Sequence, residues 1–297
     1  MAHPHEQSAT AREQQGITLD EMLPEAARLD TLTVNGWQLG IAIIEPASTH
    51  RGNVLLVPGF TSSRSTFFCI MQQLADSGYR VVAMSQRGQP YSLGPDSPAG
   101  YSLAELGSDL IGVIDALGWN DPVHLLGHSF GGLVAAEAVI QAPTRWASVT
   151  LWNSGQQNMG QEKNFTVTLA GLRADGPRAL WVKNRLAAGQ DPDADLRGEL
   201  NRIEQFYFDR LMTTNPAQLF AGLEHLATQV DRVDELRATG VRALVSHGDA
   251  DDAWPIDQQR ADAERLGAHY VVIARAGHSA HQDNPGDAVS ALTGFWD

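Results

Sequence analysis

Gly127-His128-Ser129-Phe130-Gly131 reads G-x-S-x-G, and its flanks give the pattern chemical meaning. A short apolar run at residues 123–126 precedes it, and a segment rich in helix formers follows at residues 132–141. A serine between a strand and a helix lies on a very tight turn, which small glycine neighbours permit. Such a turn lifts the Ser129 hydroxyl out of the sheet and leaves the backbone N–H of Phe130 free at a helix N-terminus. The stretch therefore predicts a strand–turn–helix unit that presents a nucleophile.

Two later strand-like runs lead into loops that carry the partners a serine nucleophile needs. Residues 241–246 are apolar and precede a loop with several acids, and residues 269–274 precede Gly277-His278. A serine hydroxyl is a poor nucleophile at neutral pH, so it requires a base, and the base requires an acid that orients it. An acid after one strand and a histidine after the next match this requirement.

From about Thr31 to the C-terminus the chain resembles the α/β-hydrolase superfamily, most weakly between residues 154 and 235. The resemblance implies Ser129 as nucleophile and His278 as general base. Four acids crowd the loop after residue 248, and their spacing alone does not choose among them. The family pattern H-G-x-x-D-x-x-x-P places the catalytic acid on Asp251.

The same resemblance implies an oxyanion hole made of two backbone N–H groups, those of Phe60 and Phe130. The family usually has His-Gly in the first of these two loops, where this chain has Pro58-Gly59. A main-chain donor does not depend on that side chain, so we expect the hole to survive. A second departure lies at residues 85–92, where Ser85 and Pro90 replace the usual aspartate and second glycine, so we expect an altered loop shape.

Two further residues narrow the chemistry. Some relatives carry their catalytic acid after the strand at residues 148–152, but Asn153 follows it here and cannot serve as an acid, which favours Asp251. The elbow carries serine and not aspartate, which argues against the dehalogenases and epoxide hydrolases of this fold, because those enzymes use a carboxylate nucleophile. For the substrate pocket we name His128, Trp152 and Trp254, which flank the catalytic loops. Arg64, just past the oxyanion loop, is a further candidate, with a surface arginine at a helix start as its alternative.

The pattern of apolar runs predicts an α/β fold with a mostly parallel central sheet of about eight strands, flanked by helices. Residues 31–44 read as a hairpin that turns at Asn35-Gly36. From residue 53 onward strands alternate with helical segments, which indicates parallel strands with crossovers. Residues 154–235 break the alternation and predict an inserted helical cap. The expected organisation is a flexible arm at residues 1–18, a hydrolase core at 19–153 and 236–297, and the cap between its two parts.

Bulk composition fits an enzyme that acts on a small molecule. The net charge of −14 disfavours nucleic acid and anionic membranes as partners. No run approaches 18 apolar residues and the first 15 residues are polar, so we expect neither a membrane span nor a secretory signal, and a cytoplasmic location. We expect no cofactor and no metal site. The oligomeric state is left open.

We therefore expect a serine hydrolase that cleaves a carboxylic ester, lactone or thioester of a small acyl substrate through an acyl-enzyme. The alternative keeps the three residues and changes the reaction to acyl transfer, C–C bond hydrolysis or cyclisation. A third hypothesis is a non-catalytic receptor for a small ligand. An activated serine weighs against it, because a receptor needs none.

Overall fold

The computed structural model describes residues 12–157 and 162–297. Its centre is one eight-stranded sheet with the order β1-β2-β4-β3-β5-β6-β7-β8. The strands are β1 Arg28–Val34, β2 Trp37–Ile44, β3 Gly52–Val57, β4 Tyr79–Met84, β5 Val123–His128, β6 Trp146–Trp152, β7 Arg242–Gly248 and β8 His269–Ile273. Strands β1, β2 and β4 pair antiparallel, and every other neighbouring pair is parallel. The predicted α/β fold with about eight mostly parallel strands is confirmed.

The hairpin of β1 and β2 forms where the Asn-Gly signal predicts it. Val34 pairs with Trp37, and Asn35 and Gly36 between them have φ angles of 50° and 84°. A two-residue turn with both φ angles positive matches the right-handed twist of the flanking strands. The hairpin therefore closes the antiparallel end of the sheet.

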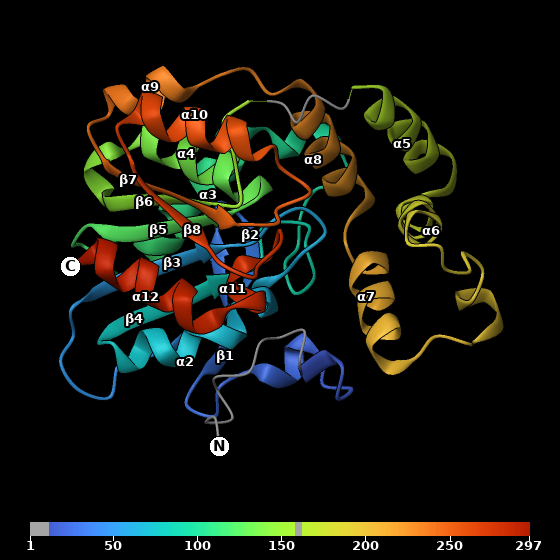
Figure 1. Cartoon of the computed structure of the whole chain (residues 1–297), viewed down its shortest axis with the longest axis horizontal. Helices are drawn as coiled ribbons and strands as arrows, with labels where there is room; N and C mark the ends of the chain where they lie inside the picture. The colour runs from blue at the N-terminus through green and yellow to red at the C-terminus, as the bar shows by residue number, and fades with distance from the viewer. Residues whose placement is uncertain (1–11, 158–161) are drawn as a thin grey trace.

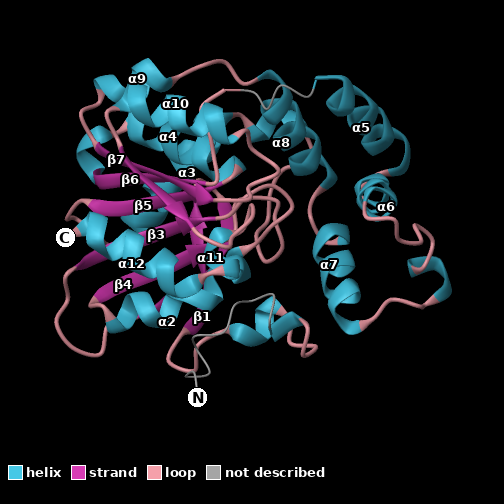
Figure 2. Ribbon diagram, viewed as in Figure 1, coloured by secondary structure: helices cyan, strands magenta, loops and turns pink. Residues whose placement is uncertain are grey.

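Helices cover both faces of the sheet (Figure 1). One face packs against α3 Leu103–Ala116, α4 Phe130–Gln141, α9 Val233–Ala238 and α10 Ile256–Leu266. The other packs against α2 Phe68–Asp76 and α12 Pro285–Trp296, with the short α11 Ala280–Asp283 beside them. Figure 2 shows the sheet between these two layers. Because helices bury both faces of the sheet, the parallel strands need apolar side chains on both sides, and their sequences are nearly continuous hydrophobic runs.

Short 3₁₀ turns complete the described part of the core and the insertion. They are η1 Leu19–Met22, η2 Arg64–Phe67, η3 Pro98–Tyr101, η4 Pro143–Arg145 and η5 Asp195–Arg197. Within the described residues, no helix is both long enough and apolar enough to cross a membrane.

Between β6 and β7 the chain forms a helical insertion, which we define as α5 through α9. Its first four helices are α5 Glu162–Asp175, α6 Arg178–Ala187, α7 Arg202–Met212 and α8 Pro216–Thr228. Helices α5, α6 and α7 lie to one side of the sheet layers (Figure 1), whereas α9 packs on α4 and α10 of the core. Asn201 accepts from the amides of Ile203 and Glu204 and so begins α7 with a capping box.

The segment just before η1, part of the predicted arm, forms hydrogen bonds with the helical insertion. The guanidinium of Arg202 donates to the carbonyl of Gly16 at 3.1 Å, and the Tyr207 hydroxyl donates to the carboxylate of Glu13. Residues 12–18 are thereby attached to α7, because two polar side chains of that helix find their partners there. The prediction for residues 1–11 lies outside the described residues.

Candidate active site

Ser129 lies on the tight turn between β5 and α4, at the carboxyl edge of the sheet. Its φ of 53° and ψ of −123° are strained for a residue with a Cβ, and such strain is stored mainly at functional sites. Two hydrogen bonds hold the turn: the Ser129 amide donates to the Trp152 carbonyl at 2.9 Å, and the Ser154 hydroxyl donates to the Ser129 carbonyl at 2.8 Å. The surrounding glycines are required, because a Cβ on Gly127 would lie 2.2 Å from the Gly131 oxygen.

His278 and Asp251 complete a hydrogen-bonded chain that begins at Ser129. His278 Nε2 lies 2.9 Å from Ser129 Oγ, and His278 Nδ1 lies 2.9 Å from Asp251 Oδ1. An ionised carboxylate can only accept, so Nδ1 carries the proton toward Asp251 and leaves the Nε2 lone pair for the Ser129 hydroxyl. Residues 129, 251 and 278 follow three different strands and meet at one edge of the sheet, so the imidazole can take the serine proton.

Asp251 is held as a carboxylate by donors from three directions. Burial, the largest single influence, raises its pKa, but His278 and the hydrogen bonds from Asn153 and Gln259 together outweigh burial, so the pKa of Asp251 lies well below its ordinary value. The side-chain amides of Asn153 and Gln259 each donate to Oδ2 at 3.0 Å, and the backbone amides of Ala253 and Trp254 donate to Oδ1. Hydrogen bonds to the charged form keep it charged.

The neighbouring acids of the same loop lie elsewhere. Asp249 accepts from the backbone amides of Arg275 and Ala276 and so ties this loop to the one that carries His278. Asp252 and Asp257 are exposed or partly exposed. Among the four acids that spacing left open, Asp251 is the one within hydrogen-bond distance of His278.

The two backbone amides expected from the sequence to form an oxyanion hole are those of Phe60 and Phe130. No hydrogen-bond partner of the Phe60 amide or the Phe130 amide is found among the described residues, and both lie on turns beside Ser129. The loop after β3 is fixed from below by two buried glutamines that the sequence did not single out. Gln86 Nε2 donates to the Pro58 carbonyl at 2.7 Å, and Gln89 Nε2 donates to the Gly59 carbonyl at 2.8 Å.

The altered loop at residues 85–92 thus supports the oxyanion loop directly. Arg87 anchors it from the other side, because its guanidinium forms a bidentate pair with buried Asp109 at 2.6 Å. The sequence did contain a signal for this support, because the loop at residues 85–92 carries two glutamines whose amide groups can donate to backbone carbonyls.

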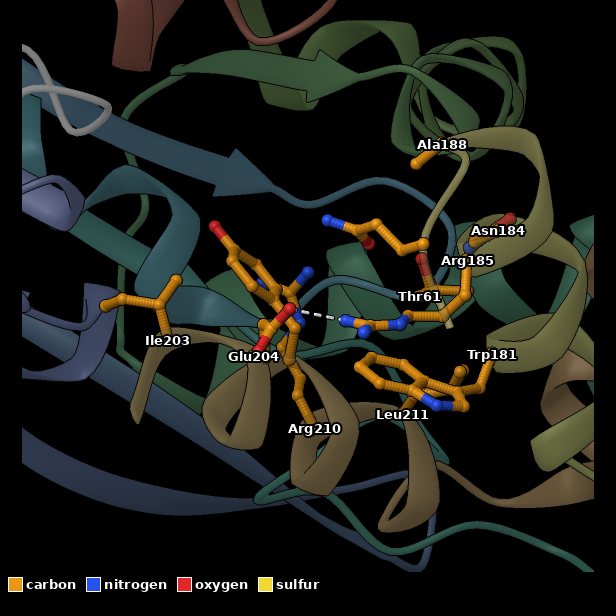
Figure 3. Close-up of a pocket in the computed structure, with 11 residues that line it drawn as sticks. Thr61, Trp181, Asn184, Arg185, Ala188, Ile203, Glu204, Arg210 and Leu211 are labelled. Atoms are coloured by element: carbon orange, nitrogen blue, oxygen red, sulfur yellow. Dashed lines mark hydrogen bonds and ion pairs between the residues drawn. The ribbon is translucent and has the colours of Figure 1, made fainter. Parts of the chain in front are cut away.

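A cavity of about 210 Å³ opens onto Ser129 and His278. Phe60, Thr61 and His128 line it on the core side, and Tyr207 and Arg210 line it from α7 of the insertion. A second cavity of about 370 Å³ lies between α6 and α7 and shares Thr61, Tyr207 and Arg210 with the first (Figure 3). The shared residues make the second cavity an extension of the first.

The four residues named for the pocket have different positions. His128 lines the first cavity, and its Nε2–H donates to the His278 carbonyl at 2.9 Å; burial lowers its pKa to about 3, so this imidazole is neutral. Trp152 and Trp254 are buried in the packed core and line neither cavity. Arg64 also lies outside both cavities: its guanidinium donates to the Ile41 carbonyl and stacks over Tyr91 at 4.3 Å.

These positions have a physical reason. Indole rings next to the catalytic loops fill the space under them, because large apolar side chains gain most by full burial. Arg64 buries its stem and satisfies its charged end on the core side of the loop. The residues that sequence reasoning missed, Tyr207 and Arg210, lie on a helix of the predicted helical cap, but the sequence did not show which face of that helix meets the site.

Comparison with known proteins agrees with this architecture. A model of the alpha/beta hydrolase family matches residues 54–292, so the chain belongs to the α/β-hydrolase family. A proposed carbamate hydrolase of Variovorax paradoxus is 35% identical over 130 residues, which are 42% of this chain and 47% of the relative. The acetyltransferase component of the acetoin-cleaving system of Cupriavidus necator is 30% identical over 239 residues, 79% of this chain and 60% of the relative. The chain therefore spans only about half to three fifths of these two relatives.

Among solved structures, an enol-lactonase from Burkholderia xenovorans LB400 superposes with a TM-score of 0.74 at 22% identity, covering 90% of this chain and 99% of that one. At this identity the likeness shows the fold. The chain is thus similar to hydrolases in sequence and in architecture, and its reaction must be argued from its own site.

Proposed function

We propose that this protein is a serine hydrolase that cleaves a carboxylic ester, lactone or thioester of a small molecule. The observation that carries the proposal is the unbroken chain of hydrogen bonds from Ser129 through His278 to Asp251, at 2.9 Å for each step. A sequence relative named as a proposed carbamate hydrolase supports acyl chemistry.

The reaction begins when His278 Nε2 takes the proton of the Ser129 hydroxyl and Oγ attacks the substrate carbonyl carbon. The tetrahedral oxyanion is stabilised by the N–H groups of Phe60 and Phe130, each such donor lowering the barrier by about 3 kcal/mol. Asp251 stabilises the imidazolium that forms and keeps it oriented. The bond between the carbonyl carbon and the leaving group then breaks. The protonated His278 gives its proton to the leaving atom, which is the oxygen of an alcohol or the sulfur of a thiol, and an acyl-enzyme remains.

Hydrolysis of the acyl-enzyme repeats the steps with water. His278 removes a proton from water as its oxygen attacks the acyl carbon, and the same proton returns to Ser129 Oγ when the second tetrahedral intermediate collapses. The acid product leaves and the enzyme is restored. We assign α6 and α7 as the cap of this mechanism: α7 lines the cavity at Ser129, α6 lines the second cavity beside it, and such a cover reduces the access of bulk water.

The test is covalent labelling and turnover on the whole chain. Wild type is expected to gain the mass of one fluorophosphonate adduct and to hydrolyse a panel of esters, lactones and thioesters, with products identified by mass spectrometry. Ser129→Ala should lose the adduct and at least about 1000-fold of the turnover while it keeps its circular dichroism spectrum. Ser279→Ala, which removes a second hydroxyl from the same cavity, should still be labelled. Labelling or full turnover in Ser129→Ala would contradict the mechanism.

A further inference from the structure

Arg210 brings a cation to the cavity above Ser129 without a partner of its own. It projects from α7 and lines both the catalytic cavity and its extension (Figure 3). Among the described residues, its guanidinium forms no ion pair, and its buried Nε has no hydrogen-bond partner. The guanidinium carbon lies over the rings of Tyr207 at 4.7 Å and Phe206 at 5.7 Å, and none of its N–H groups donates a hydrogen bond to a described residue.

The acids around Arg210 are engaged by other groups. Glu13 accepts a hydrogen bond from the Tyr207 hydroxyl, and Asp20 accepts one from the Tyr91 hydroxyl. Burial lowers the pKa of Arg210, and the two carboxylates oppose this effect from a distance. Neither carboxylate lies within ion-pair distance of it.

Arg185 lines the same extension, and unlike Arg210 it has hydrogen-bond and ion-pair partners. It stacks over Trp181 at 5.2 Å, as Arg210 stacks over its rings, but its edge donates to the Asp191 carbonyl at 2.8 Å and to the carboxylate of Glu204. Figure 3 shows the Arg185–Glu204 pair beside the free Arg210. A charged group kept in a partly buried site without its pair costs free energy, which a ligand of opposite charge repays.

The lining of the catalytic cavity supports an anion. None of its described residues is an aspartate or glutamate, and Arg210 is its one permanently charged side chain; the full lining is Leu19, Gly59, Phe60, Thr61, Ser62, Thr66, His128, Ser129, Tyr207, Arg210, His278, Ser279 and Gln282. His128 is neutral because burial lowers its pKa to about 3. The space of about 210 Å³ suits a short chain between the scissile carbonyl and the guanidinium.

We propose that Arg210 is a substrate-binding residue that pairs with a carboxylate, so that the preferred substrate is a short ester, lactone or thioester carrying a second, ionised carboxyl group. This inference rests on the proposed function. A guanidinium edge matches a carboxylate with two parallel hydrogen bonds. A phosphate group, with a charge of about −1.5 to −2, would leave excess negative charge beside a single cation.

The experiment compares substrates that differ only in charge. Monoethyl esters of four- to six-carbon dicarboxylic acids are paired with esters whose free carboxylate is replaced by a carboxamide, and the acid released is measured by chromatography. Wild type should prefer the carboxylate member by about 10- to 100-fold in kcat/KM, because a site built for a charged hydrogen-bond partner rejects the neutral analogue. Arg210→Gln should lose that preference, because kcat/KM should fall much further for the carboxylate member than for the carboxamide member. Arg210→Lys should keep part of it, since it retains the charge without the planar fork.

Arg202→Gln is the matched control. It removes the same charge from the same helix, but its side chain is 65% exposed and pairs with Glu21 outside the cavity. It should keep the wild-type preference. An equal preference in wild type and Arg210→Gln, or equal losses for both members of each pair, would overturn the inference and leave Arg210 a packing residue of α7.

A binding measurement separates this inference from the proposed function. Ser129→Ala is titrated with each dicarboxylate monoester by calorimetry, alone and combined with Arg210→Gln. Binding that weakens about 10-fold or more in the double variant supports the carboxylate site even if wild type turns over none of the esters. If Ser129→Ala binds none of the monoesters while fluorophosphonate still labels the wild-type protein, the proposed carboxylate site is wrong. The proposed serine hydrolase activity would then still hold.

Discussion

At the scale of single residues, Asn153 is the least obvious part of the site. Its side-chain amide donates both to Asp251 Oδ2 and to the Gly277 carbonyl, each at 3.0 Å, and so joins the loop of the acid to the loop of the histidine. The residue has a φ of 50°, which asparagine tolerates better than most side chains. Some relatives carry their catalytic acid at the position of Asn153. In this protein Asn153 instead orients Asp251, which follows another strand.

Replacement of Asn153 by glycine should therefore lower kcat by roughly 10- to 100-fold, because a small misplacement of the acid and the imidazole is enough. The free energy of unfolding should fall by about 1–3 kcal/mol, since buried acceptors lose a donor. Asn153→Ala should be less stable than Asn153→Gly by about 1 kcal/mol, because alanine resists a positive φ. Urea denaturation and steady-state kinetics measure both quantities. Equal stability of the two variants would show that the backbone strain is released elsewhere.

At the scale of elements, the connection between β5 and α4 decides where Ser129, the proposed nucleophile, lies. Helix α4 begins directly after Ser129, and Gly127, Gly131 and Gly132 let it approach the sheet. A Cβ on Gly131 would lie 2.5 Å from the Val57 carbonyl oxygen, and one on Gly132 would lie 2.2 Å from Ser154 Oγ. At Gly127 and Gly131 the close contact is made by backbone, so no side chain can move aside there to relieve a substitution.

Gly127→Ala should thus destabilise the protein by about 3 kcal/mol and impair turnover, because the turn must open to admit the methyl group. Gly294→Ala is the matched comparison in α12: a Cβ there meets nothing within 4 Å. The same change should stabilise that exposed helix position by about 0.5–1 kcal/mol. Thermal and urea unfolding of the two variants give the test, and a stable, active Gly127→Ala would contradict the packing account.

At the scale of the whole molecule, several histidines are buried in neutral form. Burial lowers the pKa of His124 to about 4 and that of His128 to about 3, and it holds the pKa of His281 well below its usual range. His124 lies at the end of β5 that is far from Ser129. Its Nδ1 shares a hydrogen bond of 2.8 Å with the Ser148 hydroxyl, and its ring stacks on Trp296. Each such imidazole resists protonation in the folded state and accepts it freely when unfolded.

Stability should therefore be full above about pH 6.5 and fall as the pH drops toward 4, because in that interval the unfolded chain binds more protons than the folded one. Each buried histidine contributes a slope of about 1.4 kcal/mol per pH unit once the pH is well below 6.5. His124→Phe should reduce the slope by about that amount while it leaves ester turnover intact, as it lies away from Ser129. Urea unfolding between pH 7.5 and 4.5 measures the slope, and an unchanged slope in the variant would refute the assignment of His124 as a contributor.

The sequence could predict a structural feature where residues close together in the chain decide it. The β1–β2 hairpin followed from Asn35-Gly36, and the alternation of strands and helices from residue 53 onward followed from the apolar runs, because turn sterics and hydrophobic periodicity are local. The attachment of residues 12–18 to α7 did not follow from any pattern. It depends on Glu13 meeting Tyr207, 194 residues away.

The sequence by itself determined the order of strands and helices, the sharp turn at Ser129 and the presence of an acid and a histidine after later strands, because hydrophobic periodicity and glycine sterics act over a few residues. Only the tertiary structure decided that His278 meets Asp251 among four nearby acids, that the tryptophans face the core, and that Arg210 faces the cavity. Those outcomes depend on the angles at which distant elements pack, and side-chain volumes across the whole molecule set these angles.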